Sequence, residues 1–322
     1  MRQLSSLLLL AVLTVLSACT PKAAVVAQSA APLSSAPAYA PTASDTSLLW
    51  RITGPGITGE SYLYGTIHII PAEDYFLANG VISALNDAEE VVFEIDPRQM
   101  QDPMAMMGLM SKINMNGETS LEDLLTFEEY TAVESYFNKM GLPFFIFKRM
   151  KPLFLSAMIG QDMEALQQGG GMTGGDTKSY ELEMTELAKA AGKKISGLET
   201  MEFQLSLFDS IPYQAQAQML YKAVQEEADG TGGGESEMDR LVDMYTRKAV
   251  AEMATTISYE TAEISRFEEL LLTKRNENWV PKIKSLSAIG PRLYAVGAGH
   301  LGGEKGVISL LRQEGLRVEA VY

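Results

Sequence analysis

Residues 293–300, Leu-Tyr-Ala-Val-Gly-Ala-Gly-His, form an apolar and aromatic run that ends in a Gly-x-x-His pattern. The same pattern closes residues 62–68, Tyr-Leu-Tyr-Gly-Thr-Ile-His, near the other end of the chain. Each run is typical of a strand, so His68 and His300, the only 2 histidines, lie just beyond two strand ends. Because ligands of open sheets collect at the carboxyl ends of strands, we expect the two imidazoles to share one site.

Other strands are expected near both ends of the folded region. Residues 49–52 and 61–66 flank a Gly-Pro-Gly turn and predict a hairpin, and residues 90–96 predict a third, mostly buried strand. Residues 292–296 and 315–321 return to strand after a long helical stretch, with a helix from about 303 to 313 between them.

Helices predominate from about residue 98 to 285. One strand, 193–199, interrupts them and follows an amphipathic helix, 180–191, that ends at Gly192. Strands at both ends with helices between them predict a mixed α/β (α+β) fold. We expect a central sheet formed by N- and C-terminal strands, with a large helical middle, as a single domain over 47–322.

Composition limits the classes of function. The chain has 322 residues and is 46% hydrophobic, which is enough to build a substantial core. Its formal net charge of -15 argues against nucleic acid as a partner, because Lys and Arg carry most of the binding to phosphates.

The N-terminus is typical of an export signal. A short positive start and an apolar stretch, 7–16, precede Leu16-Ser17-Ala18-Cys19, which resembles the bacterial lipoprotein lipobox. We therefore expect a signal peptide over 1–18 and a membrane anchor through lipid on Cys19, the single cysteine. An ordinary signal peptide with a chance cysteine is the alternative. Residues 19–46 are rich in Ala, Ser and Pro and predict a solvated tether, which places the protein in the bacterial cell envelope, on the periplasmic side or the cell surface.

Three glutamates occupy positions like those of the histidines. Glu94 and Glu199 end predicted strands, and Glu181 begins a predicted helix. Two histidines with one or two carboxylates suffice to hold a divalent metal ion. A glutamate more often caps a helix, pairs with Arg or is exposed, but Glu94 lies in an apolar run where an unpaired carboxylate is costly. For the histidines, the alternative is a hydrogen-bonded pair of sheet residues.

An ordered set of motifs resembles the TraB/GumN family from about residue 47 to the end. They are residues 62–68, 93–96, 179–181, 197–200, Arg275-Asn276 with Trp279, and 294–303. This family is similar to the membrane-tethered TIKI metalloproteases and is grouped with the erythromycin-esterase (EreA) and haem-binding ChaN-like folds. The resemblance implies that His68, His300 and Glu94 bind a divalent metal, with Mn, Co and Zn as the alternatives. It gives Glu199 and Arg275 less definite roles, and Glu181 stands where many relatives have Gly-x-Asp.

The resemblance implies a metal-dependent hydrolase, above all a peptidase acting on a peptide or protein, and the lipobox-like N-terminus adds export and a lipid anchor. A metal ion lowers the pKa of bound water, a second glutamate moves the proton, and Arg275 either steadies developing negative charge or neutralises buried acids. The alternative is a lipoprotein that binds haem, a metal or a peptide in the same cleft without turnover.

Two further patterns have structural interpretations. Six methionines between Met100 and Met115 can bind copper(I), but methionines at helical spacing more often pack. The glycine-rich stretch 169–175 lacks the Gly-Lys-Ser/Thr ending of a phosphate-binding loop and predicts a flexible loop beside the site.

Overall fold

The computed structural model describes residues 39–101, 108–109, 112–156, 158–159, 177–230, 237–256 and 269–322. Tyr39–Tyr322 belong to one compact unit, in which Arg312 Nη1 donates to the carbonyl of Tyr39. Its main sheet has six strands in the order β6-β4-β7-β2-β1-β8. They are β1 (Leu49–Thr53), β2 (Ser61–Thr66), β4 (Glu90–Ile95), β6 (Lys194–Glu199), β7 (Arg292–Gly297) and β8 (Arg317–Val321).

Strand direction explains where the site forms. The four strands β6, β4, β7 and β2 are parallel neighbours, so their carboxyl ends meet at one edge of the sheet. Strand β1 runs antiparallel to both β2 and β8, and Leu49 pairs with Tyr64 on one side and Val321 on the other. The predicted mixed α/β fold is therefore confirmed, including the hairpin and the sheet shared by the first and last strands.

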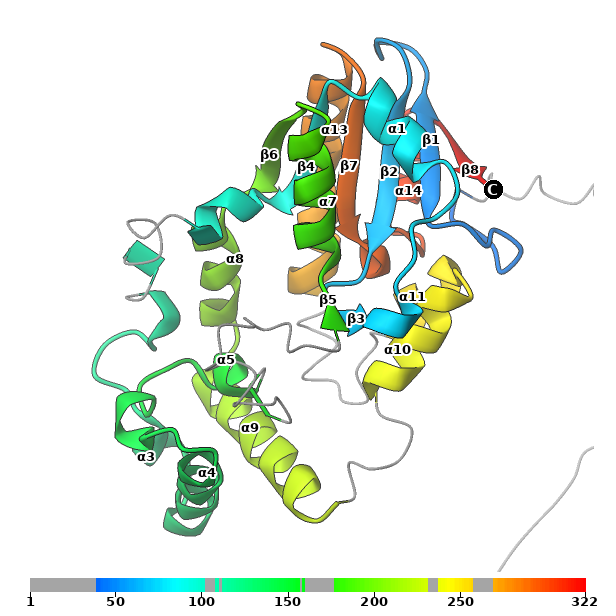
Figure 1. Cartoon of the computed structure of the whole chain (residues 1–322). Coiled ribbons are helices and arrows are strands. Elements are labelled where there is room, and N and C mark those ends of the chain that lie inside the picture. Colours follow the sequence, from blue (N-terminus) through cyan, green and yellow to red (C-terminus); the bar gives the residue numbers. More distant parts are fainter. Residues whose placement is uncertain are drawn as a thin grey trace, which may run out of the picture. The chain divides into compact units, whose positions relative to one another are not determined.

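Helices cover both faces of this sheet (Figure 1). On one face lie α1 (Val81–Asp87) and α7 (Tyr180–Ala190), and on the other α13 (Lys274–Ser287) and α14 (Val307–Gln313). Four consecutive residues of β4, 91–94, are buried, as expected of a parallel strand covered on both faces. The side chain of Ser179 caps α7, and Gly192 follows its end with a φ of 64°. This left-handed conformation suits glycine after a helix.

A second apolar cluster lies among helices from the middle of the chain. Leu121, Phe137, Phe144, Leu155 and Leu220 are buried in it. The helices are α3 (Leu121–Leu124), α4 (Phe127–Lys139), α5 (Pro152–Ser156) and α9 (Tyr213–Ala228). Helix α4 begins with a capping box between Thr126 and Glu129.

Short elements complete the described part of the chain. Strands β3 (Ile70–Pro71) and β5 (Thr177–Lys178) pair antiparallel in a small second sheet. The remaining helices are η1 (Ala72–Asp74), η2 (Pro97–Gln101), η3 (Phe144–Ile146), α8 (Met201–Leu207), η5 (Phe208–Ser210), α10 (Glu237–Thr246), α11 (Val250–Thr256), η7 (Glu269–Thr273) and η8 (Ala298–His300). None of the helices in the described ranges has the length and apolar character needed to cross a bilayer.

Helix α14 starts later than the sequence pattern predicts. The predicted helix over about 303–313 is wrong in its first turn, because α14 begins at Val307. Gly303 has a φ of 78°, a left-handed conformation that a right-handed helix does not contain. The Lys305 carbonyl accepts a hydrogen bond from Asn276 Nδ2. Residues 302–306 therefore form a turn that is bonded to α13.

Two sequence patterns fall largely outside the described residues. The glycine-rich stretch 169–175 is among them, as are several methionines of the segment from Met100 to Met115. Met115 itself is buried in the second apolar cluster, where it packs as a core side chain.

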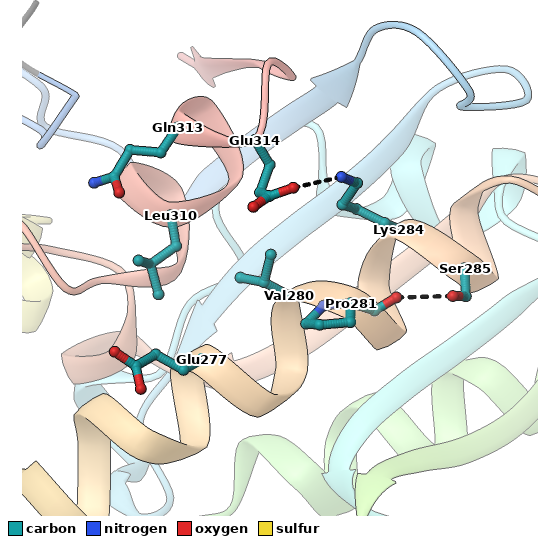
Figure 2. Close-up of a pocket in the computed structure, with 8 residues that line it drawn as sticks. All are labelled: Glu277, Val280, Pro281, Lys284, Ser285, Leu310, Gln313 and Glu314. Carbon is teal, nitrogen blue, oxygen red and sulfur yellow. Dashed lines mark hydrogen bonds and ion pairs between the residues drawn. The ribbon is translucent and has the colours of Figure 1, made fainter.

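A cavity of about 400 Å³ lies between α13 and α14 (Figure 2). Val280, Pro281 and Leu310 give it apolar walls, and Lys284 forms an ion pair of 2.7 Å with Glu314. Neither histidine is among the residues that line it. This cavity is therefore separate from the two histidines.

Candidate active site

His300 is held in a fixed orientation at the end of β7. The carboxyl end of this strand continues into η8, and His300 is buried there. Its Nδ1 lies 2.6 Å from Asn276 Oδ1, while Asn276 Nδ2 donates to the Lys305 carbonyl. Because the amide nitrogen is already donating, the amide oxygen accepts from Nδ1–H. The Nε2 atom of His300 is then unprotonated, so its lone pair can accept a hydrogen bond or bind a metal ion.

His68 lies beyond the end of β2 and is much more accessible. Its side chain is 72% exposed, and its Nδ1 is 2.9 Å from Glu181 Oε1. Glu181 is in the first turn of α7, where Ser179 Oγ donates to its second carboxylate oxygen. A carboxylate bonded to one ring nitrogen leaves the other, Nε2, to face a ligand.

Arg275 joins the two strand-end carboxylates. Its Nε and Nη2 donate to Glu199 Oε1 at 2.8 and 2.6 Å, and Nη2 also donates to Glu94 Oε2. Its Nη1 donates to the Leu271 carbonyl and lies 3.2 Å from His300 Nε2. All five N–H groups of the guanidinium therefore have acceptors among these partners.

The carboxylates have additional donors. Gln204 Nε2 donates to Glu199 Oε1 at 2.7 Å and lies 3.3 Å from Glu94 Oε2. Trp279 Nε1 donates to Glu199 Oε2 at 3.0 Å, and the Gly297 amide donates to Glu94 Oε1 at 2.7 Å. Burial of two carboxylates is tolerable here because each is both paired and hydrogen-bonded.

Both motif glycines lie where a side chain would crowd its neighbours. A Cβ on Gly65 would lie 2.7 Å from Leu301 Cδ1, and a Cβ on Gly297 would lie 3.2 Å from Glu94 Oε1. The first glycine of each Gly-x-x-His pattern therefore lets the backbone pass beside the site without a clash.

The two histidines have opposite electrostatic environments. The hydrogen bond and the negative charge of Glu181 raise the pKa of His68 to about 9. Burial lowers the pKa of His300 to about 3, so this ring stays neutral. Burial alone would raise the pKa of Glu94, but His300, Arg275 and His68 together lower it to about 2. The site thus holds a neutral imidazole beside an ionised carboxylate.

One pocket brings the motif residues together. A cavity of about 360 Å³ at the strand ends is lined by His68, Glu94, Arg275 and His300. Glu199 contacts Arg275 and Glu181 contacts His68, each directly behind a lining residue. All six residues singled out in the sequence therefore meet at the carboxyl edge of the sheet.

Comparison with known proteins places the chain in a family. The sequence model of the TraB/PrgY/gumN family matches residues 48–320. The chain belongs to the TraB/PrgY/gumN family. It is 22% identical to metalloprotease TIKI2 of Danio rerio over 322 residues, covering 85% of this chain and 60% of that protein. It is 22% identical to metalloprotease TIKI1 of Danio rerio over 326 residues, covering 87% and 64%.

The similarity has limits in length and in structure. This TraB/PrgY/gumN chain spans less than two thirds of the length of either TIKI protein, 60% and 64%. No solved structure matches the chain significantly. The family assignment therefore rests on sequence similarity.

The imidazole nitrogens of His68 and His300 and the carboxylate of Glu94 are suitable ligands for a divalent ion, but they are not yet arranged around one point. Two ligand atoms on a tetrahedral ion, each about 2.1 Å from it, lie about 3.4 Å apart. Glu94 Oε1 and His300 Nε2 are 3.7 Å apart, close to that value. No three His, Cys, Asp or Glu side chains of the described residues already form a metal-binding group. For His68, Glu94 and His300 to hold one ion, the three side chains would have to come closer together and Arg275 Nη1 would have to release His300 Nε2.

Two contacts of this TraB/PrgY/gumN site are absent from the sequence predictions. Gln204 follows Glu199 by five residues on α8, which begins after the Thr200 cap. The only indication in the sequence that Gln204 belongs to the site is its position on a helix that begins directly after strand β6. Tyr245 donates from Oη to the Gly65 carbonyl across 180 residues of sequence, and no local pattern indicates that contact.

We expect the two histidines to titrate far apart in metal-free protein. Because the fold raises the pKa of His68, the stabilisation from its pair with Glu181 is present below its ordinary value of 6.5. That stabilisation is lost as the pH rises through about 9. His300 should stay neutral over the same range. NMR of labelled imidazoles, assigned with His68→Gln, measures both, and Glu181→Gln should return His68 toward 6.5. If both histidines titrated near the ordinary pKa of 6.5, this prediction would be wrong.

Asn276 is expected to act on metal affinity through His300. Asn276→Leu removes the acceptor of the Nδ1 proton, so the ring loses its fixed orientation. We expect metal affinity to fall roughly 10–100-fold, the usual cost of losing such a partner. Asn276→Asp keeps an acceptor and should retain most of the affinity. Calorimetric metal titration tests this, and equal affinities for Asn276→Leu and wild type would exclude the orienting role.

Proposed function

We propose that this chain is a metal-dependent hydrolase of peptide bonds. The observation that carries the proposal is the convergence of His68, Glu94 and His300 in one pocket at the carboxyl ends of β2, β4 and β7. The similarity to two metalloproteases supports the peptide as the substrate class. The same donor set suits Mn, Co or Zn.

In this proposal, His68, Glu94 and His300 hold the ion. When bound, a divalent ion lowers the pKa of a water molecule and polarises a carbonyl. Asn276 fixes His300 so that Nε2 faces the pocket, and Glu181 does the same for His68. Glu94 remains ionised because Arg275 and the Gly297 amide stabilise its negative charge.

The remaining charged residues Arg275, Glu199 and Glu181 have three different roles in this proposal. Every N–H group of Arg275 already has an acceptor, which favours neutralisation of the buried acids over direct contact with substrate. Glu199 accepts from Arg275, Gln204 and Trp279, so we assign it a positioning role. Glu181 is 26% exposed and adjoins His68, so we assign proton transfer to Glu181.

A binding protein without turnover is the second candidate. It is favoured by the ion pairs of Arg275, which already satisfy Glu94 and Glu199 without a metal. In this reading the pocket takes up haem, a metal ion or a peptide and releases it unchanged.

Metal analysis followed by a substrate panel separates the two candidates. Purified protein is titrated with Mn, Co and Zn and then incubated with a broad set of peptides and esters. Hydrolysis that stops with a chelator and returns with metal supports the hydrolase. Metal uptake with every substrate intact supports the binding protein, and no uptake at all removes the metal site.

We also propose that the mature protein is anchored in the cell envelope by lipid on Cys19. The lipobox-like Leu16-Ser17-Ala18-Cys19 and the Ala/Ser/Pro-rich segment after it support this. These residues lie outside the described part of the chain. The protein should partition into detergent after phase separation of cell extracts, and Cys19→Ser should move it to the aqueous phase. Equal partitioning of both would refute the anchor.

A further inference from the structure

The pocket that contains the histidines has two chemically different sides. Its polar side is made by His68, Glu94 and His300 near the strand ends and by Arg275 of α13. Its other side is apolar and comes from elements outside the main sheet. The apolar side chains are Phe208 of η5, Leu241 and Tyr245 of α10, Met253 of α11, and Leu271 and Leu272 of η7. We call these six residues the apolar wall.

The apolar wall is fixed to the polar side by specific contacts. Leu241 and Tyr245 are four residues apart on α10 and so share one face of that helix. Tyr245 Oη donates to the Gly65 carbonyl at 3.0 Å, which ties α10 to β2. A Cβ on Gly302 would overlap the Val250 carbonyl, so α11 closely approaches the turn after His300.

The helix before Arg275 brings two more leucines to the wall. The segment η7 is a π-helical turn, a form that occurs frequently at functional sites. Within it, the Leu271 carbonyl accepts from Arg275 Nη1. This hydrogen bond holds the backbone of Leu271 against Arg275, so the side chains of Leu271 and the next residue, Leu272, are close to the charged residues of the pocket.

Several wall residues are only partly covered by the protein. Phe208, Leu241, Leu271 and Leu272 are half-buried, and the cavity they face has about 360 Å³. Covering such surface with an apolar side chain is favourable, whereas a charged side chain would lose its hydration there. Glu94, the carboxylate that lines the pocket, is already paired with Arg275 and so offers no free charge to a basic side chain.

We infer that the apolar wall is a specificity subsite for a large aliphatic or aromatic side chain next to the scissile bond. The inference rests on the proposed hydrolase function, and it adds the substrate class. Peptides with Leu, Met or Phe at that position are preferred over peptides with Asp, Glu, Lys or Arg. The volume lies near the lower end of the range of about 300–1,000 Å³ for ligand pockets, which suits one or two peptide residues rather than a macrocycle.

Leu241 provides a test of the subsite. Leu241→Ala shortens the wall, so we expect kcat/KM for Leu and Phe peptides to fall roughly tenfold, with little change for Ala peptides. Leu310→Ala is the matched control. It removes a half-buried leucine from the cavity between α13 and α14 (Figure 2) and should leave the ranking of peptides unchanged.

The experiment combines a cleavage profile with a binding assay. Metal-loaded protein is given a peptide library, and cut positions are identified by mass spectrometry. Analogues with a reduced, uncleavable peptide bond are titrated by calorimetry into wild type and both variants. Cleavage or binding that prefers apolar residues and weakens only in Leu241→Ala supports the subsite.

The other outcomes distinguish failure of the subsite from failure of the proposed function. Cleavage without an apolar preference overturns the subsite and leaves the hydrolase intact. Binding of apolar analogues that depends on Leu241, with no peptide cut, supports the subsite and overturns the hydrolase. Neither cleavage nor binding overturns both.

Discussion

Arg275→Met is expected to lower the free energy of unfolding by about 3–5 kcal/mol. The substitution leaves Glu94 and Glu199 buried without their cation, and Gln204, Trp279 and the Gly297 amide alone do not neutralise two carboxylates. Urea unfolding at neutral pH, followed by circular dichroism, measures the change.

Arg51→Met is the matched control for this prediction. Arg51 also has two carboxylate partners, Glu60 and Glu319, but these three side chains are 42%, 47% and 46% exposed. Such pairs contribute about 0–1 kcal/mol. If Arg275→Met were no more destabilising than Arg51→Met, the buried cluster would not depend on its cation. Adding Glu94→Gln and Glu199→Gln to Arg275→Met should recover part of the stability.

This cluster also gives the stability of the wild type a pH dependence. The fold lowers the pKa of Glu94 from 4.5 to about 2. The contribution of ionised Glu94 to the free energy of unfolding is therefore fully present above pH 4.5. It is lost as the pH falls through the lowered pKa of about 2.

His300→Ala is expected to have the largest effect on metal binding and hydrolysis. It removes a neutral imidazole whose Nε2 lies 3.7 Å from Glu94 Oε1. Loss of an outer-shell partner already costs about 10–100-fold in affinity, so loss of a ligand should cost more than about 100-fold. Chelator-free protein titrated with Mn, Co and Zn, with hydrolysis of the best peptide measured in parallel, tests this.

Two controls separate the loss of a ligand from a folding defect. Gln313→Ala changes the cavity between α13 and α14 and should leave metal affinity unchanged. The His300→Ala protein should also unfold cooperatively in urea. If it folds and binds metal like wild type, His300 is not a ligand and the proposed site is wrong.

The sequence predicts the parts of the fold and site that depend on local pattern. Apolar runs before His68 and His300 indicate the parallel strands β2 and β7, and parallel neighbours place their carboxyl ends together. Glu94 and Glu199 follow from the same rule, because both lie at the ends of adjacent strands. Periodicity and strand ends thus suffice to bring these four side chains to one edge.

Contacts that cross elements are not visible in such patterns. The sequence offers two roles for Arg275, and only the structure reveals that its N–H groups are all occupied by Glu94, Glu199, Leu271 and His300. Tyr245 and the apolar wall come from helices with no motif of their own. Amphipathic spacing indicates which face of a helix is covered, but not which strand end it covers.

The pairing of β1 with β8 has a consequence for how the protein is made. Leu49 and Val321 are adjacent in the sheet although almost the whole folded chain separates them, and β2 finds its parallel partner only in β7. Contacts of such long sequence separation form slowly, because a long loop must close first. The pocket therefore cannot assemble while the C-terminal strands are still being synthesised. A chain that stops short of β7 would carry only the first of the two histidines and would lack the candidate site.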